Sequence, residues 1–469
     1  MTGPQGEPVA LGTARGRWLV TVTVLASGMA FLDSTAVQVA LPSIGRELDS
    51  SLAGLQWTIT GYTLALASLI LLGGSLGDRY GRRRVFLVGV AWFALASLVC
   101  GVAQTTGQLV AARGLQGVGG ALLTPGSLAL IQSSFRPADR ARAIGLWSAL
   151  AGISGLIGPF LGGVLVDAVS WRLVFLINVP VAVVILAVAG RHVPESRDGG
   201  PHGRFDVLGA ALGALALGAS TYALIAAGTS LVRPDVLGAA AVGIAAGAAF
   251  VVRERRAGDP MLPLGLFADR QFTGANLATL LIYGALGGNS LFLVLQLQTV
   301  LGYDATAAGA AMLPSIALLT LLSARGGALA QRIGPRLPMT VGPLLVAAGT
   351  LLLVGVDGSA PYVVEVLPGS LLQGLGMAAT VAPLTATVLG AAPDALAGIA
   401  SGVNNAVARA AQLLAVAALP VAVGLSGDDY TQPGAFTQGY RVAMIACAVL
   451  FALGAAVAWR TIRADVLQQ

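Results

Sequence analysis

The chain has 469 residues, of which 56% are hydrophobic and only 10% carry a charge. Ordinary soluble domains have about 25% charged residues, and a soluble core cannot absorb this much apolar sequence. The composition therefore excludes an ordinary soluble enzyme and favours a protein embedded in a lipid bilayer.

The net charge of +6 arises from 27 basic residues, all of them arginine, against 21 acidic ones. The arginines are spread over many short loops and form no basic stripe with interleaved aromatic residues, so the sequence predicts no nucleic-acid partner. Cys100 and Cys447 lie in apolar segments, where cysteine packs as a small hydrophobic residue. We predict neither a disulfide nor a metal site.

Apolar segments recur along the whole chain, and about 20 such residues suffice to cross a hydrocarbon layer about 30 Å thick. We predict an all-α membrane protein with fourteen transmembrane helices at residues 17–41, 52–76, 84–103, 108–134, 139–166, 171–191, 205–228, 235–252, 269–300, 306–331, 337–356, 361–389, 395–424 and 438–460.

The distribution of arginine predicts the orientation of these helices. If the N-terminus is cytoplasmic, 21 arginines lie on the cytoplasmic side, Arg113 and Arg409 lie within spans, and four lie outside: Arg46, Arg172, Arg233 and Arg441. Cytoplasmic loops of membrane proteins are enriched in basic residues. Because the number of spans is even, we expect both termini in the cytoplasm.

The first predicted span contains Asp33, 16 residues from its start, which is about 24 Å along a helix. A carboxylate at that depth is costly unless it faces water or a partner, and intramembrane ionisable residues usually mark proton or ion paths. Arg113 enters the fourth span at a comparable depth. We therefore predict that Asp33 and Arg113 couple transport to protons, with a static ion pair between the two helices as the alternative.

The loop after the second span has the sequence GSLGDRYGRRR at residues 74–84, and a weaker copy, GALAQRIGPR, occurs at 327–336. Arginines that set the topology would explain Arg82 and Arg83, but they would not explain Asp78 or the glycines. Gln331 occupies the place of Asp78 in the copy. We expect Asp78 to pair with Arg82 or Arg83.

A second repeat links LQGVG at 115–119 with LQGLG at 372–376. The spacing between repeats exceeds what six helices need, and the surplus matches two extra helices. We therefore predict a six plus two plus six arrangement: an N-terminal six-helix bundle at 1–195, a two-helix insertion with linkers at 196–260, and a C-terminal six-helix bundle at 261–469. Substrates of such parallel repeats bind between the halves.

Other polar residues in the apolar segments are candidates for a substrate cavity. Gln116 and Gln373 either line the cavity or cross-link helices, since amides serve both purposes in membrane bundles. Asn404, Asn405 and Arg409 lie in the thirteenth predicted span, with Arg409 near mid-membrane. An arginine there favours anionic or neutral cargo, or balances Asp33.

Four signatures in order resemble the major facilitator superfamily, in its fourteen-span drug:proton antiporter branch of the EmrB/QacA type: LDSTAVQVALP at 32–42, GSLGDRYGRR at 74–83, LVAARGLQGVGG at 109–120 and GLIGPFLGG at 155–163. The segment WRLVFLINVP at 171–180 resembles the same branch. The resemblance covers nearly the whole chain.

This resemblance implies roles for two of the signatures. The loop would form a cytoplasmic gate that is shut in the outward-facing state, with the residues Gly74, Asp78, Arg79, Gly81, Arg82 and Arg83. The segment 155–163 would form the antiporter helix, with Gly155, Gly158, Pro159, Gly162 and Gly163. Glycines at this spacing let helices approach closely, whereas proline bends a helix.

The function that the resemblance implies is the efflux of small amphipathic organic compounds in exchange for protons across the bacterial cytoplasmic membrane, which confers resistance. A dedicated exporter of one secondary metabolite or antibiotic is the first alternative, and a nutrient:proton symporter is a weaker one. We expect no enzyme and no cofactor. The glycine-rich runs lack the Gly-Lys-Ser/Thr element of a phosphate loop, so the proton gradient rather than ATP is the expected energy source.

Overall fold

A computed structural model of the chain describes residues 9–196, 206–228, 230, 232–258, 260–359, 361–393 and 396–464. In these ranges the protein is helical, and its extended pairing is limited to one isolated bridge between Val9 and Phe135. Thirteen helices are long and apolar enough to cross a bilayer, or fourteen if the bent helix α2 counts as one span. The prediction of an all-α membrane protein is therefore confirmed.

The N-terminal part of the chain forms one bundle of helices, which we call the N-terminal bundle. In it α4 packs against both α2 and α3, α5 packs against α1, and α7 packs against α1 and α3. Its helices are α1 (Ala14–Glu47), α2 (Leu52–Tyr80), α3 (Arg82–Gly101), α4 (Thr106–Ser134), α5 (Pro137–Ala168), α6 (Arg172–Leu176) and α7 (Asn178–His192).

The C-terminal part repeats this packing in a second bundle, the C-terminal bundle. Here α14 packs against α11 and α12, α15 packs against α10, and α16 packs against α10 and α12. Its helices are α10 (Arg270–Leu295), continued by a short π-helix (Gln296–Val300), α11 (Ala305–Ile333), α12 (Arg336–Leu353), α13 (Tyr362–Glu365), α14 (Leu367–Gly390), α15 (Ala397–Ala422) and α16 (Pro433–Thr461).

Two further helices, α8 (Val207–Ala226) and α9 (Pro234–Arg256), pack against each other. Helix α8 also packs against α2 of the N-terminal bundle and α15 of the C-terminal bundle. The linker before α8, residues 197–205, lies outside the described residues.

Several helix ends differ from the predicted ones for identifiable reasons. Helix α1 continues past the predicted end at residue 41 to Glu47 with Pro42 inside it, since neighbouring helices can compensate for a proline within a membrane helix. The predicted span 171–191 is divided into α6 and α7 at Ile177, and the predicted span 361–389 is divided into α13 and α14 at Val366. Helix α2 bends by 50° near residue 71.

The two copies of the loop motif end their helices in the same way. Gly81 follows α2 with φ 111°, and Gly334 follows α11 with φ 83°. Residues with a side chain rarely adopt positive φ, whereas glycine does so at little cost. The repeat recognised in the sequence is thus also a repeat of backbone geometry.

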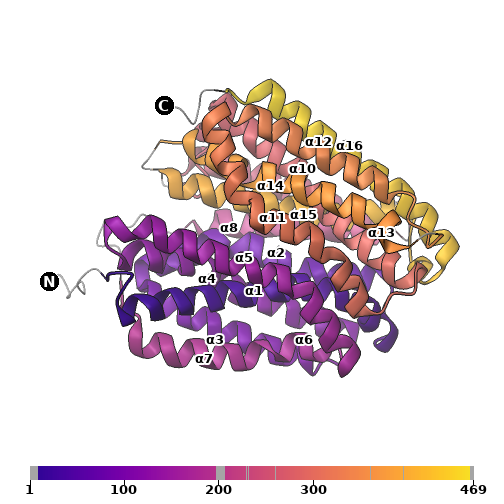
Figure 1. Cartoon of the computed structure of the whole chain (residues 1–469), viewed down its shortest axis with the longest axis horizontal. Helices are drawn as coiled ribbons and strands as arrows, with labels where there is room; N and C mark the ends of the chain where they lie inside the picture. The colour runs from indigo at the N-terminus through magenta and orange to yellow at the C-terminus, as the bar shows by residue number, and fades with distance from the viewer. Residues whose placement is uncertain are drawn as a thin grey trace.

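The first and last helices place the described chain ends on the same side of the molecule, which is the left side in Figure 1. We call it the termini side. On the opposite side the bundles are bonded to each other: the Asp167 carboxylate of α5 accepts from the backbone N–H of Thr306 at 2.7 Å. The Tyr430 hydroxyl donates to the carbonyl of Ser50 at 2.7 Å.

Two pairs of helices form the seam between the bundles, α5 with α11 and α2 with α15. Gly162 and Gly158 let α5 approach α1, since a Cβ on Gly162 would lie 2.6 Å from that of Ala36. Gly163 lies directly against the backbone of Ala305 at the start of α11. Helix α5 is therefore clamped between its own bundle and the other one, with small residues at both contacts.

Candidate functional site

A cavity of about 930 Å³ lies between the two bundles. Its lining includes Gly145, Ser323, Leu389 and Ser401, each within about three turns of a helix end on the termini side. Because the bundles are bonded on the opposite side, the cavity extends toward the termini side. Its volume is that of a site for a drug-sized molecule.

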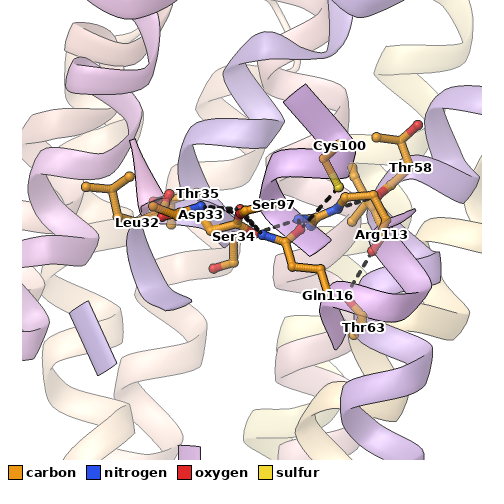
Figure 2. Close-up of polar contacts among 12 residues, drawn as sticks. Leu32, Asp33, Ser34, Thr35, Thr58, Thr63, Ser97, Cys100, Arg113 and Gln116 are labelled. Carbon is orange, nitrogen blue, oxygen red and sulfur yellow. Dashed lines mark hydrogen bonds and ion pairs between the residues drawn. The ribbon is translucent and has the colours of Figure 1, made fainter. Parts of the chain in front are cut away.

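Asp33 of α1 is fully buried and forms an ion pair with Arg113 of α4, with 2.6 Å between Oδ2 and Nη1. The other carboxylate oxygen accepts from the side-chain amides of Gln116 at 2.8 Å and Asn178 at 3.2 Å. Ser97 accepts from the same two amides. Figure 2 shows Asp33, Ser97, Gln116 and Arg113 joined in one row of polar contacts. The carboxylate of α1 therefore has partners from two other helices, α4 and α7.

Arg113 connects this network to the cavity. Its Nε donates to the carbonyl of Thr58 at 3.0 Å, and its guanidinium lies 4.4 Å from the centre of the Tyr62 ring. Arg113 and Tyr62 both line the cavity, whereas Asp33 is not among the residues that line it. A molecule in the cavity would thus contact the arginine of the pair while the carboxylate stays behind it. The sequence expected Asp33 to face either water or a partner, and the structure places it against a partner.

The C-terminal bundle contains an uncharged counterpart of this network. The Gln373 amide donates to Asn289 Oδ1 and to the Thr350 hydroxyl, both at 3.0 Å. Gln373 corresponds to Gln116 in the repeat of the LQG motif. The two bundles therefore share a polar cluster at equivalent places, and the titratable carboxylate belongs to the N-terminal one.

Of the five predicted cavity residues, Gln373, Asn404, Asn405 and Arg409 line the cavity. Gln116 does not, and its assignment to the cavity is corrected here: its amide group is occupied by bonds to Asp33, Ser97 and Arg113. Gln116 is a helix cross-link, which was the alternative left open by the sequence.

Within the loop signature Arg82 forms an ion pair with Asp78 at 2.8 Å, and Arg84 contacts Glu195 at 3.8 Å. Arg83 instead donates to the carbonyl of Val193, and its backbone N–H donates to Glu195. Arg79 lies 5.7 Å from the centre of the Tyr80 ring. Gly74 precedes the pair and Gly81 lies between its two residues in the chain, and a Cβ on Gly81 would lie 2.7 Å from the Glu195 carboxylate. The resemblance implies that this loop contacts the other bundle in the outward-facing state. That contact stays a prediction.

The glycine–proline segment divides between packing and the cavity. Gly158, Gly162 and Gly163 contact neighbouring helices, and the carbonyl of Pro159 lies against Gly309 of α11. Gly155 and Pro159 line the cavity. A Cβ on Gly155 would have no atom within 4 Å. The segment therefore forms both a seam between helices and part of the cavity wall.

The sequence analysis missed several residues that complete the site. Asn178 lies within the quoted segment 171–180, but an isolated asparagine in an apolar segment does not reveal which helix it will face. Ser97 is a single hydroxyl in α3, and membrane helices carry many such residues. Tyr62 resembles an ordinary core aromatic residue in the sequence. Only the packing of α1, α2, α3, α4 and α7 reveals that these side chains converge.

Residues 23–416 match the family model of the Major Facilitator Superfamily. The puromycin resistance protein pur8 of Streptomyces alboniger is 38% identical, over 94% of this chain and 91% of the relative. The methylenomycin A resistance protein of Streptomyces coelicolor is 36% identical, over 94% and 92%. The multidrug resistance protein Stp of Mycobacterium tuberculosis is 38% identical, over 82% and 72%.

Solved structures share the fold at low sequence identity. A peptide transporter, POT, in complex with sulfate has a TM-score of 0.70 at 14% identity, and the match covers 98% of this chain and 100% of that one. A bacterial homologue of the human lysosomal transporter Spinster has a TM-score of 0.67 at 17% identity, with 96% and 98% covered. The match to the family model and the similarity to the three resistance proteins show that the chain belongs to the Major Facilitator Superfamily.

Proposed function

We propose that this protein exports amphipathic organic compounds, antibiotics among them, in exchange for protons across the bacterial cytoplasmic membrane. The observation that carries the proposal is a fully buried carboxylate, Asp33, paired with Arg113 at the wall of a drug-sized cavity. Several relatives that match most of the chain are named for drug resistance or antibiotic export, which supports efflux as the direction.

The transport unit is proposed to be six plus two plus six helices, with bundles at 1–195 and 261–469 and the two-helix insertion at 196–260. The arginine distribution supports a cytoplasmic location of both termini. With that orientation the termini side is cytoplasmic, and the structure is an inward-facing conformation. Substrate would enter from the cytoplasm and leave after the bundles rock about the central cavity.

Proton coupling is proposed to act through the charge of Asp33. When Asp33 is ionised, Arg113 is held by the pair and by the carbonyl of Thr58. Protonation removes the opposite charge, and Arg113 is then free to turn toward the cavity, where its new position changes the affinity for the bound substrate. Export and proton entry thus alternate on one site, which is the requirement for exchange.

One carboxylate suffices energetically for this exchange. A proton driven by 100 mV contributes about 2.3 kcal/mol, and each pH unit adds about 1.4 kcal/mol. A tenfold concentration ratio costs about 1.4 kcal/mol. Because the counterpart cluster of Asn289, Thr350 and Gln373 contains no acid, we propose a stoichiometry of one proton per cycle.

The cytoplasmic gate is proposed to consist of Gly74, Asp78, Arg79, Gly81, Arg82 and Arg83. In the inward-facing conformation Asp78 is held by Arg82 within its own loop. In the outward-facing conformation it would face the positive N-terminal end of a helix in the other bundle. The glycines of 155–163 would let α5 shift against α1 and α11 as the bundles rock.

A dedicated exporter of one compound is the second candidate. It is favoured by the names of relatives that each mention a single antibiotic, such as puromycin or methylenomycin A. A resistance profile of cells with and without the gene distinguishes the two candidates, because a multidrug exporter protects against several unrelated compounds.

Inside-out membrane vesicles test the exchange itself. Respiration acidifies their lumen. Because the cytoplasmic face of the membrane is outside, the exporter should carry a substrate added outside into the lumen while protons move out. A pH-sensitive dye should then report a more alkaline lumen, and vesicles with the Asp33→Asn protein should give no response. A more acidic lumen would indicate symport, and no protection and no proton movement with any compound would refute the proposed function.

A further inference from the structure

Arg409 is a cation in the cavity without a partner. It lies in the middle of α15 and lines the cavity between the bundles. It is half-buried, and it makes no hydrogen bond or ion pair with any described residue. A charged side chain at this depth is costly unless it faces water or an opposite charge. The cavity therefore contains a site at which an anion would be stabilised.

No acidic residue is found among the described residues that line the cavity. Its second arginine, Arg113, is already neutralised by Asp33. Among the described lining residues, Arg409 is consequently the one whose positive charge has no negative partner, and a ligand in this inward-facing cavity meets that charge directly. A lipophilic cation would be repelled by it, whereas an organic acid would gain a charge-assisted hydrogen bond.

The surroundings fix the part of α15 that carries Arg409, and they add hydrogen-bond donors. Asn404 donates to the Thr279 hydroxyl at 2.7 Å, which fastens α15 to α10 one turn before Arg409. A Cβ on Gly287 would lie 3.1 Å from the Cα of Gln412, so the two helices are also close on the other side. Gln412 and Asn405 line the cavity with amide groups, which can donate to an acid oxygen.

Two tyrosine hydroxyls extend this donor set across the seam. Tyr62 belongs to α2 of the N-terminal bundle, and Tyr283 belongs to α10 of the C-terminal bundle. Both tyrosines line the cavity. Hydroxyl donors from both bundles are thus present in the cavity, while apolar lining residues such as Leu286, Met312 and Ile316 accommodate an apolar body.

We propose that the preferred substrates are amphipathic organic anions of drug size, whose carboxylate or comparable acid group binds Arg409. This inference rests on the proposed function, because it assigns the chemical class of the cargo to the cavity of the exporter. The headgroup of an anionic lipid carries the same charge, but the ligand that we assign to Arg409 is a free organic acid.

Binding of three dansyl compounds to the purified full-length protein tests the inference. Dansyl-leucine is an anion, dansyl-leucinamide is its neutral analogue, and dansylcadaverine is a cation. A charge-assisted bond corresponds to about tenfold or more in affinity. We therefore expect the acid to bind about tenfold more tightly than the amide, and the cation to bind most weakly.

Variants separate charge from packing. Arg409→Gln should reduce the affinity for the acid to that for the amide, whereas Arg409→Lys should keep part of the preference. Val416→Ala is the matched control on the same helix, because Val416 lines the cavity with an apolar side chain, and it should change the affinities for acid and amide alike. If Arg409→Gln does not fold, the ratio of acid affinity to amide affinity in the wild type and in Arg409→Lys still tests the inference.

Equal affinities for acid and amide in the wild type, or an unchanged ratio in Arg409→Gln, would overturn the inference. Displacement of dansyl-leucine by added phosphatidylglycerol would also overturn it, because the anion site would then belong to a lipid. If neutral or cationic compounds are exported in exchange for protons without any preference for acids, the inference fails and the proposed function stands. If acids are preferred and no proton exchange accompanies their transport, the proposed function fails instead.

Discussion

Asp33 and Arg113 are joined by a 2.6 Å ion pair of which only the arginine lines the cavity. A substrate cannot reach the carboxylate without displacing its partner. The pair therefore allows one side chain, Arg113, to report the protonation of Asp33 to the cavity. This geometry makes the carboxylate a candidate for coupling rather than for substrate recognition.

Replacing Asp33 by asparagine should abolish proton-coupled efflux. The variant leaves the buried Arg113 uncompensated, and breaking a buried pair in this way costs about 3–5 kcal/mol. The double variant Asp33→Asn with Arg113→Gln removes both charges and serves as the folding control. Transport in proteoliposomes under an imposed pH gradient is the measurement. Wild-type efflux by the single variant would exclude Asp33 from the mechanism.

Replacing Gly162 by alanine should impair the protein, since the new Cβ would lie 2.6 Å from that of Ala36 and α5 would have to shift. Overpacking of this kind costs about 1–3 kcal/mol. Gly155→Ala is the matched control on the same helix, because its Cβ would have no atom within 4 Å. The midpoint temperature of thermal unfolding in detergent should fall for Gly162→Ala and stay unchanged for Gly155→Ala. Equal effects would contradict the packing argument.

The Tyr430 hydroxyl fastens the bundles on the side opposite the termini. Burial raises the pKa of Tyr430, so the hydroxyl keeps its proton beyond the ordinary value of about 10, and the bond should be lost only at more alkaline pH. Tyr430→Phe leaves the carbonyl of Ser50 unpaired, and this should favour the outward-facing conformation by about 1 kcal/mol.

Spin labels at Val169 and Val363, which are exposed, can measure this opening as a longer distance between the bundles. The native cysteines are buried and should not be labelled. Tyr440→Phe is the control, because the Tyr440 hydroxyl donates to the carbonyl of Leu353 within the C-terminal bundle at the same distance of 2.7 Å. A change in distance for both variants would refute the role assigned to Tyr430.

Replacing Asp78 by asparagine should slow transport with little loss of stability. The pair with Arg82 is partly exposed, with 40% of the Asp78 side chain accessible, and such pairs contribute about 0–1 kcal/mol. A gate acts on the rate of the conformational change. The turnover rate should therefore drop, while the midpoint temperature of thermal unfolding stays near that of the wild type. Asp235→Asn breaks an exposed pair with Arg233 at the opposite side and should leave turnover unaltered.

The charged part of the candidate site could be predicted from the sequence because charges in apolar segments are rare. Asp33 and Arg113 stand out on that ground, and similar depths suggested that they meet. Arg409 was placed at mid-membrane by the same reasoning, and it lines the cavity. The helices themselves follow from length and apolar content, with errors where a proline such as Pro42 did not end its helix.

The uncharged part of the site could not be predicted because its residues are common in membrane helices. Asn178, Ser97 and Tyr62 acquire their roles from the rotation of five helices about their axes, which the apolar pattern does not determine. Gln116 illustrates the limit: its position was clear, but whether its amide would face the cavity or Asp33 depended on which partner lay nearer.

Helix α8 touches α2 of one bundle and α15 of the other, and it thereby covers one of the two seams where the halves meet. A lipophilic compound dissolved among the acyl chains meets a wall of protein on that flank. On the other flank, Gly163 lies against the backbone of Ala305 and Gly309 lies against the carbonyl of Pro159, so these glycines set how closely α5 and α11 approach each other where that seam faces the lipid.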